Sequence, residues 1–377
     1  MTRISPLPAL LEAPGLRAVL RALPRARLVG GCVRDILACA AFSDIDLATP
    51  DAPDAVAAAL TAAGLRAIPT GIAHGTVTAL ADGQSFEITT LRRDVETDGR
   101  HAVVAFTDDW REDAARRDFT INAMSMTPDG EVFDYFGGIE DLRAGRLRFV
   151  GDAATRIAED YLRILRFFRF FARYATFPPD QDAIDAIAAG VGGLAMLSAE
   201  RVWSELKRIL GAPAPDEAVA LMDRLGVLKA VLPNARLAPV NALPADPLLR
   251  LVALQPRDVP DLKLSGDEVE QLLALQGTPP PANADDATLR RLLADTAPDI
   301  LIGRAWLSGA SAELRARIQA IPVPIFPLHG RDLAAAGIAP GPAMGRLLRD
   351  LRAWWMDGGC VADRAALLAQ LVERAAP

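Results

Sequence analysis

Cysteine and histidine are scarce in this chain of 377 residues, which contains three of each. Three cysteines are too few for a disulfide framework, and Cys32, Cys39 and Cys360 lack the spacing of a zinc site. None of the histidines is followed by aspartate, which argues against a His-Asp metal phosphohydrolase domain and against catalysis by a histidine base. The N-terminus shows no basic start followed by an apolar core, so we expect no export signal and a cytoplasmic location.

Long uncharged stretches are missing as well. The longest, residues 67–81, is interrupted by proline and glycine, whereas a membrane-spanning helix needs roughly 20 apolar residues. We therefore expect no membrane partner. Lysine is rare too, because only three of the 41 basic residues are lysine and the rest are arginine. With a net charge of −7, binding of nucleic acid would depend on local clusters of arginine rather than on a global field.

Strand-like and helix-like segments are unevenly distributed along the chain. Short β-branched or apolar runs between turn residues predict strands at 26–29, 45–48, 76–80, 86–90 and 103–106. A helix is expected at 53–63, and after residue 151 helical periodicity dominates, most clearly at 153–174, 199–210 and 216–225. Proline-rich segments at 232–247, 277–284 and 321–327 predict linkers or long loops. This is the pattern of an α+β protein whose mixed sheet lies in residues 1–145.

The segment from Arg27 to Asp35, RLVGGCVRD, predicts a strand that ends in two glycines directly before a helix. Gly30 and Gly31 would let the backbone approach a phosphate closely, and the start of a helix offers free N–H groups. Arg34 adds a cation at the same place. Asp35 is expected either to cap the helix or to fix Arg34.

Two carboxylates, Asp44 and Asp46, follow this cradle. Alternate residues of a strand lie on the same face, where two carboxylates repel each other unless a cation lies between them. Magnesium, which binds one or two carboxylates together with substrate phosphates, is the natural choice. Each half of this pattern occurs by itself on ordinary surfaces, but the two at this spacing indicate nucleotidyl transfer.

These motifs resemble those of the class II tRNA nucleotidyltransferases and the related bacterial poly(A) polymerases. The resemblance rests on LVGGCVRD and SDIDLAT, followed in order by further matching segments at 71–78, 86–92, 116–123, 159–163 and 200–207. It is strongest over residues 27–210 and weaker in the segment 330–342. It implies a nucleotidyltransferase head over 1–145, followed by an all-helical neck with a base-recognition motif (146–211), body (212–320) and RNA-binding tail (321–377).

The resemblance also implies roles for single residues. Asp44, Asp46 and Glu87 would be the catalytic carboxylates, and Asp44 and Asp46 would hold two magnesium ions. Contacts with the nucleotide would come from Gly30, Gly31, Arg34, Arg117, Asp118, Asn122, Asp160, Arg163 and Arg166. The alternatives are an edge-strand surface charge for Glu87 and a surface ion-pair cluster for residues 116–118. Phe119 and Ile121 are assigned to the core.

Asp160 and Arg163 are three residues apart and are expected to share one face of the helix 153–174. They would either form an ion pair or recognise the Watson–Crick edge of the incoming base, with one acceptor and one donor. The same helix continues with Arg166, Arg169 and Arg173, and a weaker stripe of Arg346, Arg349 and Arg352 follows in the tail. For Arg169, Arg173 and the tail stripe, RNA contact and a solvated face are both open.

The implied reaction is attack of a tRNA 3′-hydroxyl on the α-phosphate of CTP or ATP, which adds C, C and A without a nucleic-acid template. Poly(A) polymerase is the alternative activity, since the shared motifs do not separate the two. A non-catalytic RNA-binding protein is a third possibility, against which the intact Asp44, Asp46 and Glu87 argue. The segment 92–100 is expected to be the flexible loop that A addition needs. No obligate protein partner is inferred.

Overall fold

The computed structural model describes residues 2–5, 9–40, 45–71, 75–97, 102–176, 178–255, 257–258 and 260–375. Its backbone divides into two compact units, residues 1–233 and 234–377. The boundary between them falls in the proline-rich segment 232–247, where the sequence predicts a linker. The finer division into head, neck, body and tail stays a prediction. Each unit is described by itself.

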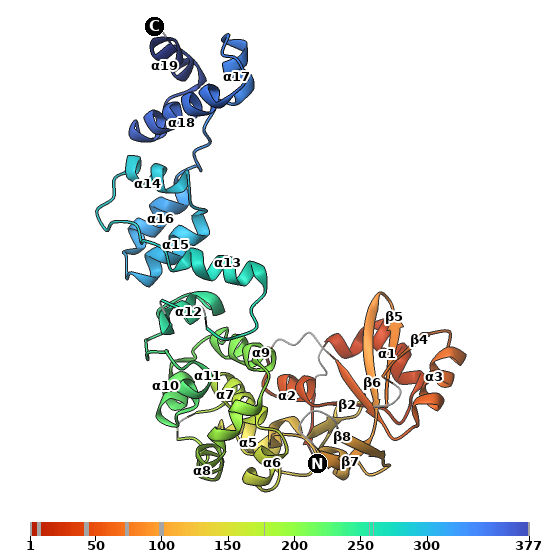
Figure 1. Ribbon diagram of the computed structural model, residues 1–377. Helices are drawn as coiled ribbons and strands as arrows, with labels where there is room; N and C mark the ends of the chain where they lie inside the picture. The colour runs from red at the N-terminus through yellow and green to blue at the C-terminus, as the bar shows by residue number, and fades with distance from the viewer. Residues whose placement is uncertain are drawn as a thin grey trace. The chain divides into compact units, whose positions relative to one another are not determined.

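A mixed sheet occupies the first part of the first unit (Figure 1). Its strands β3 and β6 are parallel to each other, and the remaining neighbours are antiparallel. In spatial order the eight strands are β1 (Thr2–Arg3), β10 (Glu131–Asp134), β9 (Met124–Met126), β2 (Arg27–Val29), β3 (Asp46–Thr49), β6 (Gln84–Thr90), β5 (Thr76–Ala81) and β4 (Arg66–Gly71). The four predicted strands that belong to this sheet are confirmed within one or two residues.

The segment 92–100 differs from its prediction. Residues 92–97 are not a loop but a strand, β7 (Arg92–Thr97), which pairs with β8 (Ala102–Phe106) as a two-stranded antiparallel sheet. Residues 98–100 lie outside the described part of the chain. Main-chain pairing, which does not depend on side-chain polarity, explains how a charged segment becomes a strand here.

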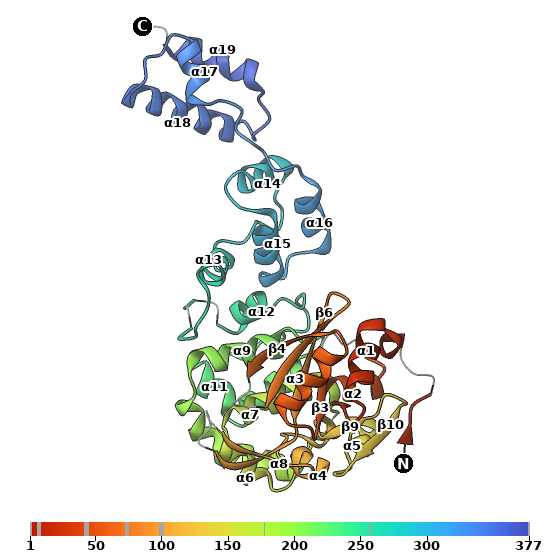
Figure 2. The same cartoon turned by 90° about the vertical axis from the view of Figure 1, so that its right-hand side faces the viewer.

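Helices α1 (Pro14–Ala22) and α3 (Pro53–Ala62) pack on one face of the sheet (Figure 2). Their apolar side chains meet those of β3 and β6 in a common core, in which Leu16, Leu60, Leu47 and Phe86 are 2% exposed or less. Successive side chains of a strand point to opposite faces. The residues next to the buried Leu47 and Phe86, namely Asp46 and Glu87, therefore lie on the other face.

The first unit contains further helical segments. They are η1 (Ala9–Glu12), α2 (Gly31–Leu37), α4 (Trp110–Ala115), η3 (Thr120–Asn122), α5 (Gly138–Ala144), α6 (Ala153–Glu159), α7 (Leu162–Tyr174), α8 (Gln181–Gly190), η4 (Val191–Met196), α9 (Ala199–Leu210), α10 (Asp216–Arg224) and α11 (Val227–Val231). The predicted helices at 53–63, 199–210 and 216–225 are confirmed. Phe119 and Ile121 lie in the core, as predicted, at 0% and 1% exposure.

The single helix expected over 153–174 is wrong, because the chain breaks between α6 and α7. Asp160 has extended backbone angles, with φ −158° and ψ 108°. The ring of Tyr161 then lies against Gly193, where an added Cβ would come within 2.1 Å of the ring. A glycine at position 193 is thus required for the corner between α6 and α7 to pack.

The described residues of the second unit form helices and the loops that connect them. Its helices are α12 (Pro247–Leu254), α13 (Gly266–Leu275), α14 (Asp286–Leu293), α15 (Pro298–Leu307), α16 (Ala312–Ala320), α17 (Gly330–Ala335), α18 (Pro342–Asp357) and α19 (Arg364–Ala375). One apolar cluster joins α14, α15 and α16, and another joins α17, α18 and α19 around Trp355. In the part of the chain that the structure describes, no helix has the length and apolar character needed to cross a membrane.

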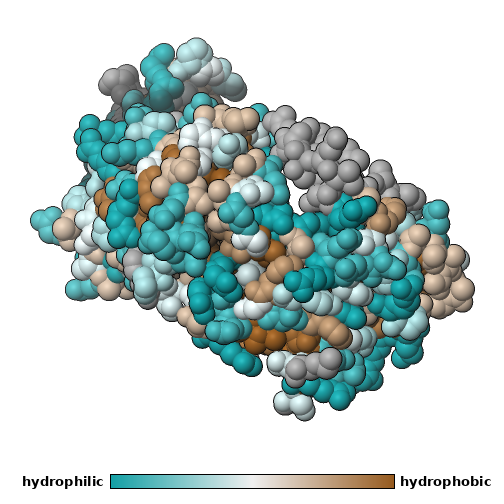
Figure 3. All heavy atoms as spheres, turned by 90° about the horizontal axis from the view of Figure 1, so that it is seen from below, coloured by the Kyte–Doolittle hydropathy of each residue, from teal (hydrophilic) through white to brown (hydrophobic). Residues whose placement is uncertain are grey.

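The fold class predicted from the sequence is therefore confirmed, with a mixed sheet first and helices afterwards. On the face shown in Figure 3, hydrophobic residues form several separate areas divided by hydrophilic ones. This distribution is ordinary for a globular surface.

Candidate active site

The first unit contains an open cavity of about 1040 Å³. It lies between the strand-to-helix turn at Gly30 and Gly31 and helices α7 and α9. Its wall is strongly basic, because three aspartates, Asp46, Asp118 and Asp160, face ten arginines: Arg34, Arg92, Arg116, Arg117, Arg163, Arg166, Arg169, Arg173, Arg201 and Arg208. Such a wall suits a polyanion. The cavity thus brings together twelve of the predicted site residues, from Gly30 to Arg173.

Gly30 directly follows β2 and has the positive φ of 71° that favours glycine. An added Cβ at this position would come within 2.7 Å of Nη1 of Arg117. The absence of a side chain therefore lets the guanidinium of Arg117 reach the turn. Gly30, Gly31 and Arg117 are brought together as the sequence predicts.

Arg34 is held from several sides at the wall of the cavity. Its Nε and Nη2 donate to the carboxylate of Asp35 at 2.9 and 3.0 Å, and its Nη1 donates to Oδ1 of Asn122 at 2.6 Å. The hydroxyl of Tyr174 donates to Asp35 at 2.6 Å, and the Arg34 guanidinium lies 4.4 Å from the centre of the Tyr174 ring. Of the two roles considered for Asp35, it therefore fixes Arg34.

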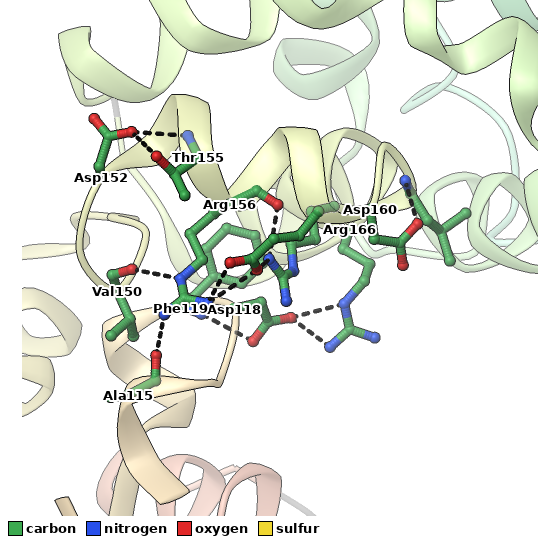
Figure 4. Close-up of polar contacts among 12 residues, drawn as sticks. Ala115, Asp118, Phe119, Val150, Asp152, Thr155, Arg156, Asp160 and Arg166 are labelled. Carbon is green, nitrogen blue, oxygen red and sulfur yellow. Dashed lines mark hydrogen bonds and ion pairs between the residues drawn. The ribbon is translucent and has the colours of Figure 1, made fainter. Parts of the chain in front are cut away.

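Asp118 joins the segment 116–123 to helix α7 (Figure 4). Its carboxylate accepts from Nε of Arg166 at 2.7 Å, from Nδ2 of Asn122 at 3.0 Å and from the N–H of Phe119 at 2.9 Å. Burial raises the pKa of Asp118, but the charge of Arg166 and these hydrogen bonds hold the pKa below its ordinary value. Asp118 is thus a buried anion that orients Arg166 toward the cavity.

Arg116 and Arg117 have a buried partner of their own. Asp113, at the end of α4, binds Arg116 at 2.9 Å and Arg117 at 3.3 Å. Burial raises the pKa of Asp113, and the two arginines lower it below the usual range. The alternative considered for residues 116–118 was an ion-pair cluster on the surface. The ion pairs are present, but both arginines line the cavity.

Two of the predicted catalytic carboxylates come from adjacent strands. Asp46 on β3 is the register partner of Glu87 on the parallel strand β6. Both side chains are exposed on the face of the sheet away from α1 and α3. Asp44 lies outside the described residues, and no group of three or more metal-ligating side chains occurs within them. Two carboxylates side by side on one open face are the oxygen donors that magnesium prefers, so the residues present fit this ion.

The corner between α6 and α7 contains the two residues predicted to recognise the base. Arg163 pairs with the carboxylate of Glu159 and donates from Nη1 to the carbonyl of Arg156 at 2.7 Å. Asp160 instead accepts from Nη2 of Arg201 at 2.7 Å. Asp160 precedes α7 rather than lying on it, so the expectation that the two residues share one helix face is wrong, and each has a different ionic partner.

Arg156 holds this corner against Val150 and the end of α4 (Figure 4). Its guanidinium binds the Glu159 carboxylate and donates to the carbonyls of Val150 and Ala115. Burial raises the pKa of Glu159, and the hydrogen bonds from Arg163 and Arg156 lower it below its ordinary value. A chain of contacts thus leads from α4 through Arg156 and Glu159 to Arg163.

Arg169 and Arg173 extend the basic wall along α7. Arg169 pairs with the buried Glu205 of α9 at 2.9 Å. Burial lowers the pKa of Arg169 to about 10, although Glu205 opposes this shift, so Arg169 remains a cation at neutral pH. Arg169 therefore does not lie on a fully solvated helix face.

The wall also contains residues that were not predicted, among them the polar Arg92, Tyr174, Arg201 and Arg208. Tyr174 ends α7, and Arg201 and Arg208 lie on α9. The amphipathic pattern of 199–210 indicated a helix with a polar face, but nothing local indicates which surface that face meets. Only the packing of α9 against α7 brings Arg201 and Arg208 to the cavity.

In the second unit, the predicted tail arginines lie on α18. Arg346 and Arg349 are exposed, and Arg352 pairs with Asp295 while 42% of its side chain remains exposed. They form an accessible basic strip on one helix.

Comparison with known proteins shows the family to which the chain belongs. A sequence family described as "Poly A polymerase head domain" matches residues 26–148, and one described as "Probable RNA and SrmB- binding site of polymerase A" matches residues 176–237. The proteins named "CCA tRNA nucleotidyltransferase 1, mitochondrial" of Mus musculus and Homo sapiens are each 39% identical to this chain, over 92% of it and 86% of their own length. The chain belongs to the CCA tRNA nucleotidyltransferase family.

The fold of the CCA tRNA nucleotidyltransferase family is also the fold of this chain. The crystal structure of the CCA-adding enzyme of Bacillus stearothermophilus in complex with CTP has a TM-score of 0.77 and 27% identity, and the match covers 96% of this chain and 98% of that one. The predicted enzyme class, a nucleotidyltransferase that acts on the 3′ end of tRNA, is confirmed. These comparisons favour CCA addition over the poly(A) alternative.

Proposed function

We propose that the basic cavity of the first unit is the site where this chain adds C, C and A to the 3′ end of tRNA. The observation that carries the proposal is one cavity lined by the Gly30 turn, Asp118 and Asp160, in which contacts through Asn122 and Asp118 join Arg34 to Arg166. The glycine turn would then bind the triphosphate, and the exposed carboxylates of the sheet would act with the metal. The α6–α7 corner would bind the base.

Asp44 and Asp46 would hold magnesium, and Glu87 on the neighbouring strand would complete the set of catalytic carboxylates. When bound, magnesium neutralises the triphosphate and lowers the pKa of the attacking 3′-hydroxyl. Arg34 and Arg117 border the glycine turn, where they would bind phosphate oxygens of CTP or ATP. Arginine suits this role because its planar fork contacts two oxygens at once.

Asp160 and Arg163 would select the base, one as acceptor and the other as donor. Both line the cavity, and each is held by an ionic partner, Asp160 by Arg201 and Arg163 by Glu159, so their positions are set before a nucleotide enters. A site built to hydrogen-bond one base edge rejects other bases because a mismatch leaves buried polar groups unpaired.

The test is a comparison of kcat/KM for CTP, ATP, UTP and GTP on a tRNA that lacks its 3′ CCA. Asp160→Ala and Arg163→Ala should each erode the preference for CTP and ATP, because each removes one hydrogen-bonding group worth roughly tenfold to a hundredfold in discrimination. An unchanged preference in both variants, with only lower thermal stability, would assign the corner a structural role. The same assay on a generic RNA separates CCA addition from poly(A) synthesis, which needs ATP alone.

We propose the cytoplasm as the site of action, as the sequence predicts. The two mammalian relatives carry the word mitochondrial in their names. Fractionation of the source cells, followed by detection of the protein with an antibody, decides between the two compartments.

A further inference from the structure

The carboxylate of Asp160 is held from two sides. Its Oδ1 accepts from the N–H of Leu162, the first residue of α7, at 3.1 Å. Its Oδ2 accepts from Nη2 of Arg201 at 2.7 Å. The side chains of Asp160 and Arg201 are only 24% and 31% exposed. Each carboxylate oxygen therefore has its own donor, one neutral and one charged, and together the two donors fix the orientation of the carboxylate.

The charged donor comes from a distant part of the sequence. Arg201 lies in the first turn of α9, 41 residues after Asp160. The apolar face of α9, with Val202, Leu206 and Ile209 buried, packs against α7. This packing holds the polar side of α9 at the cavity, where Arg201 contacts Asp160 without being near it in sequence.

We propose that Arg201 is a positioning residue that sets nucleotide preference by fixing the Asp160 carboxylate. A carboxylate offers about four acceptor sites, and the two contacts from Leu162 and Arg201 occupy two of them. The remaining sites stay available to a nucleotide base in the cavity that Asp160 lines. This inference rests on the proposed role of Asp160 in base selection.

The geometry of the guanidinium is central to this role. Arginine is a rigid planar donor, whereas lysine is a compact point charge on a flexible stem. Without Arg201, one oxygen of Asp160 has no charged donor, and the carboxylate can rotate about its side-chain bonds. Discrimination between bases then falls, because hydrogen-bond selection depends on placement to within a fraction of an ångström.

A simpler role would be that Arg201 only adds positive charge to the cavity. Arg208 provides the matched control for this role. It lies two turns further along α9, lines the same cavity, and pairs with Glu205 at 3.8 Å instead of with Asp160. Loss of charge at either position would weaken binding of any triphosphate, but only loss of Arg201 would disturb Asp160.

The experiment measures kcat/KM for CTP, ATP, UTP and GTP with the full-length chain and a tRNA that lacks its 3′ CCA. The variants are Arg201→Met, Arg201→Lys, Arg208→Met, Asp160→Ala and the double variant Asp160→Ala with Arg201→Met. We expect Arg201→Met to reduce the preference for CTP and ATP over UTP and GTP by roughly tenfold or more. Arg201→Lys should restore part of the preference. Arg208→Met should change the rates with all four nucleotides by a common factor.

The double variant tests whether Arg201 acts through Asp160. If it does, Arg201→Met should change the preference no further once Asp160 is alanine. A common loss for all four nucleotides in Arg201→Met, or additive losses of preference in the double variant, overturns the proposal. If Asp160→Ala alone leaves the preference unchanged, base selection by Asp160 fails and this inference fails with it. Melting temperatures identify a misfolded variant, and Arg201→Lys, which keeps the charge, then decides the question.

Discussion

Helices α7 and α18 carry arginines at similar spacing but in different surroundings. On α7, Arg163, Arg166 and Arg169 are paired with Glu159, Asp118 and Glu205, and their side chains are between 11% and 32% exposed. On α18, Arg346 and Arg349 are exposed, and the pair between Arg352 and Asp295 is about half exposed. Similar patterns of charge thus give a buried, oriented wall in one unit and an accessible strip in the other.

The difference teaches how burial changes the use of an arginine. Removing one partner of a buried pair leaves an uncompensated charge and costs several kcal/mol, whereas an exposed pair contributes about 0–1 kcal/mol. The α7 arginines can therefore hold a reacting triphosphate or a base in a fixed geometry. The α18 arginines are suited to contacts with phosphates that need no fixed geometry.

The largest effect should come from the open carboxylates of the first unit. Asp46→Ala or Glu87→Ala should lower nucleotide transfer by at least about a hundredfold, because in the proposed function these exposed carboxylates act with magnesium and do not pack in the core. Binding of tRNA, measured by filter retention, should remain. Asp54→Ala, which removes an exposed carboxylate from α3, is the control and should transfer nucleotides normally. Residual activity above a few per cent with magnesium present would contradict the assignment of these two residues, and the same expectation holds for Asp44→Ala.

A second prediction compares a buried with an exposed ion pair. Asp118→Asn should lower the free energy of unfolding at pH 7 by about 2–3 kcal/mol, because Arg166 would be left without its buried anion. Asp295→Asn, which removes the partner of Arg352, should cost less than about 1 kcal/mol. Urea denaturation of both variants measures the difference, and equal losses would remove the distinction between the two helices.

The pH dependence of the Asp118 contribution has a defined sign. In the folded protein, Arg166 and the hydrogen bonds to the carboxylate hold the pKa of Asp118 below the ordinary value of an aspartate. Its stabilisation is therefore present above about pH 4, the ordinary range of an aspartate, and disappears as the pH falls through the folded-state pKa. The difference in the free energy of unfolding between the wild-type protein and Asp118→Asn should therefore decrease over that pH range. A difference that persists well below this range would argue against a charged Asp118.

A third prediction concerns the exposed strip of the second unit. Replacing Arg346, Arg349 and Arg352 together by alanine should weaken tRNA binding and reduce the slope of log K against log salt, by roughly one unit for each phosphate that the strip no longer neutralises. Activity on a minimal acceptor-stem hairpin should fall less than activity on full tRNA. Equal reductions on both substrates would mean that the strip is structural.

The smallest effect concerns thiol reactivity in the two units. Burial raises the pKa of Cys32 to about 11, and burial also raises the pKa of Cys360, whereas Cys39 is exposed. At pH 8 iodoacetamide should therefore modify Cys39 first, as followed by mass spectrometry. Modification of Cys32 and Cys360 requires local opening, so their relative rates compare the local stability of the two units. Modification of Cys32 as fast as Cys39 would contradict its burial.

Periodicity and turn residues were sufficient to predict most elements. The helices at 199–210 and 216–224 and the strands around Leu47 and Ile88 follow local patterns, and the α+β class follows from their order. The break at Asp160 was not predictable, because the apolar positions continue in phase across it. It is set by the contact of Tyr161 with Gly193 and by Leu162, whose N–H donates to Asp160.

The sequence by itself determined which chemistry is available, since Gly30, Gly31, Asp46, Asp118 and Arg163 all lie in short motifs with a chemical reason for their spacing. Only the tertiary structure decided which charges meet. Helix α7 contains no acid of its own, and its arginines take Asp118, Glu159 and Glu205 as partners from three other segments. The physical reason is that an ion pair depends on distance in space and on exclusion of water. Neither quantity is specified by separation along the chain.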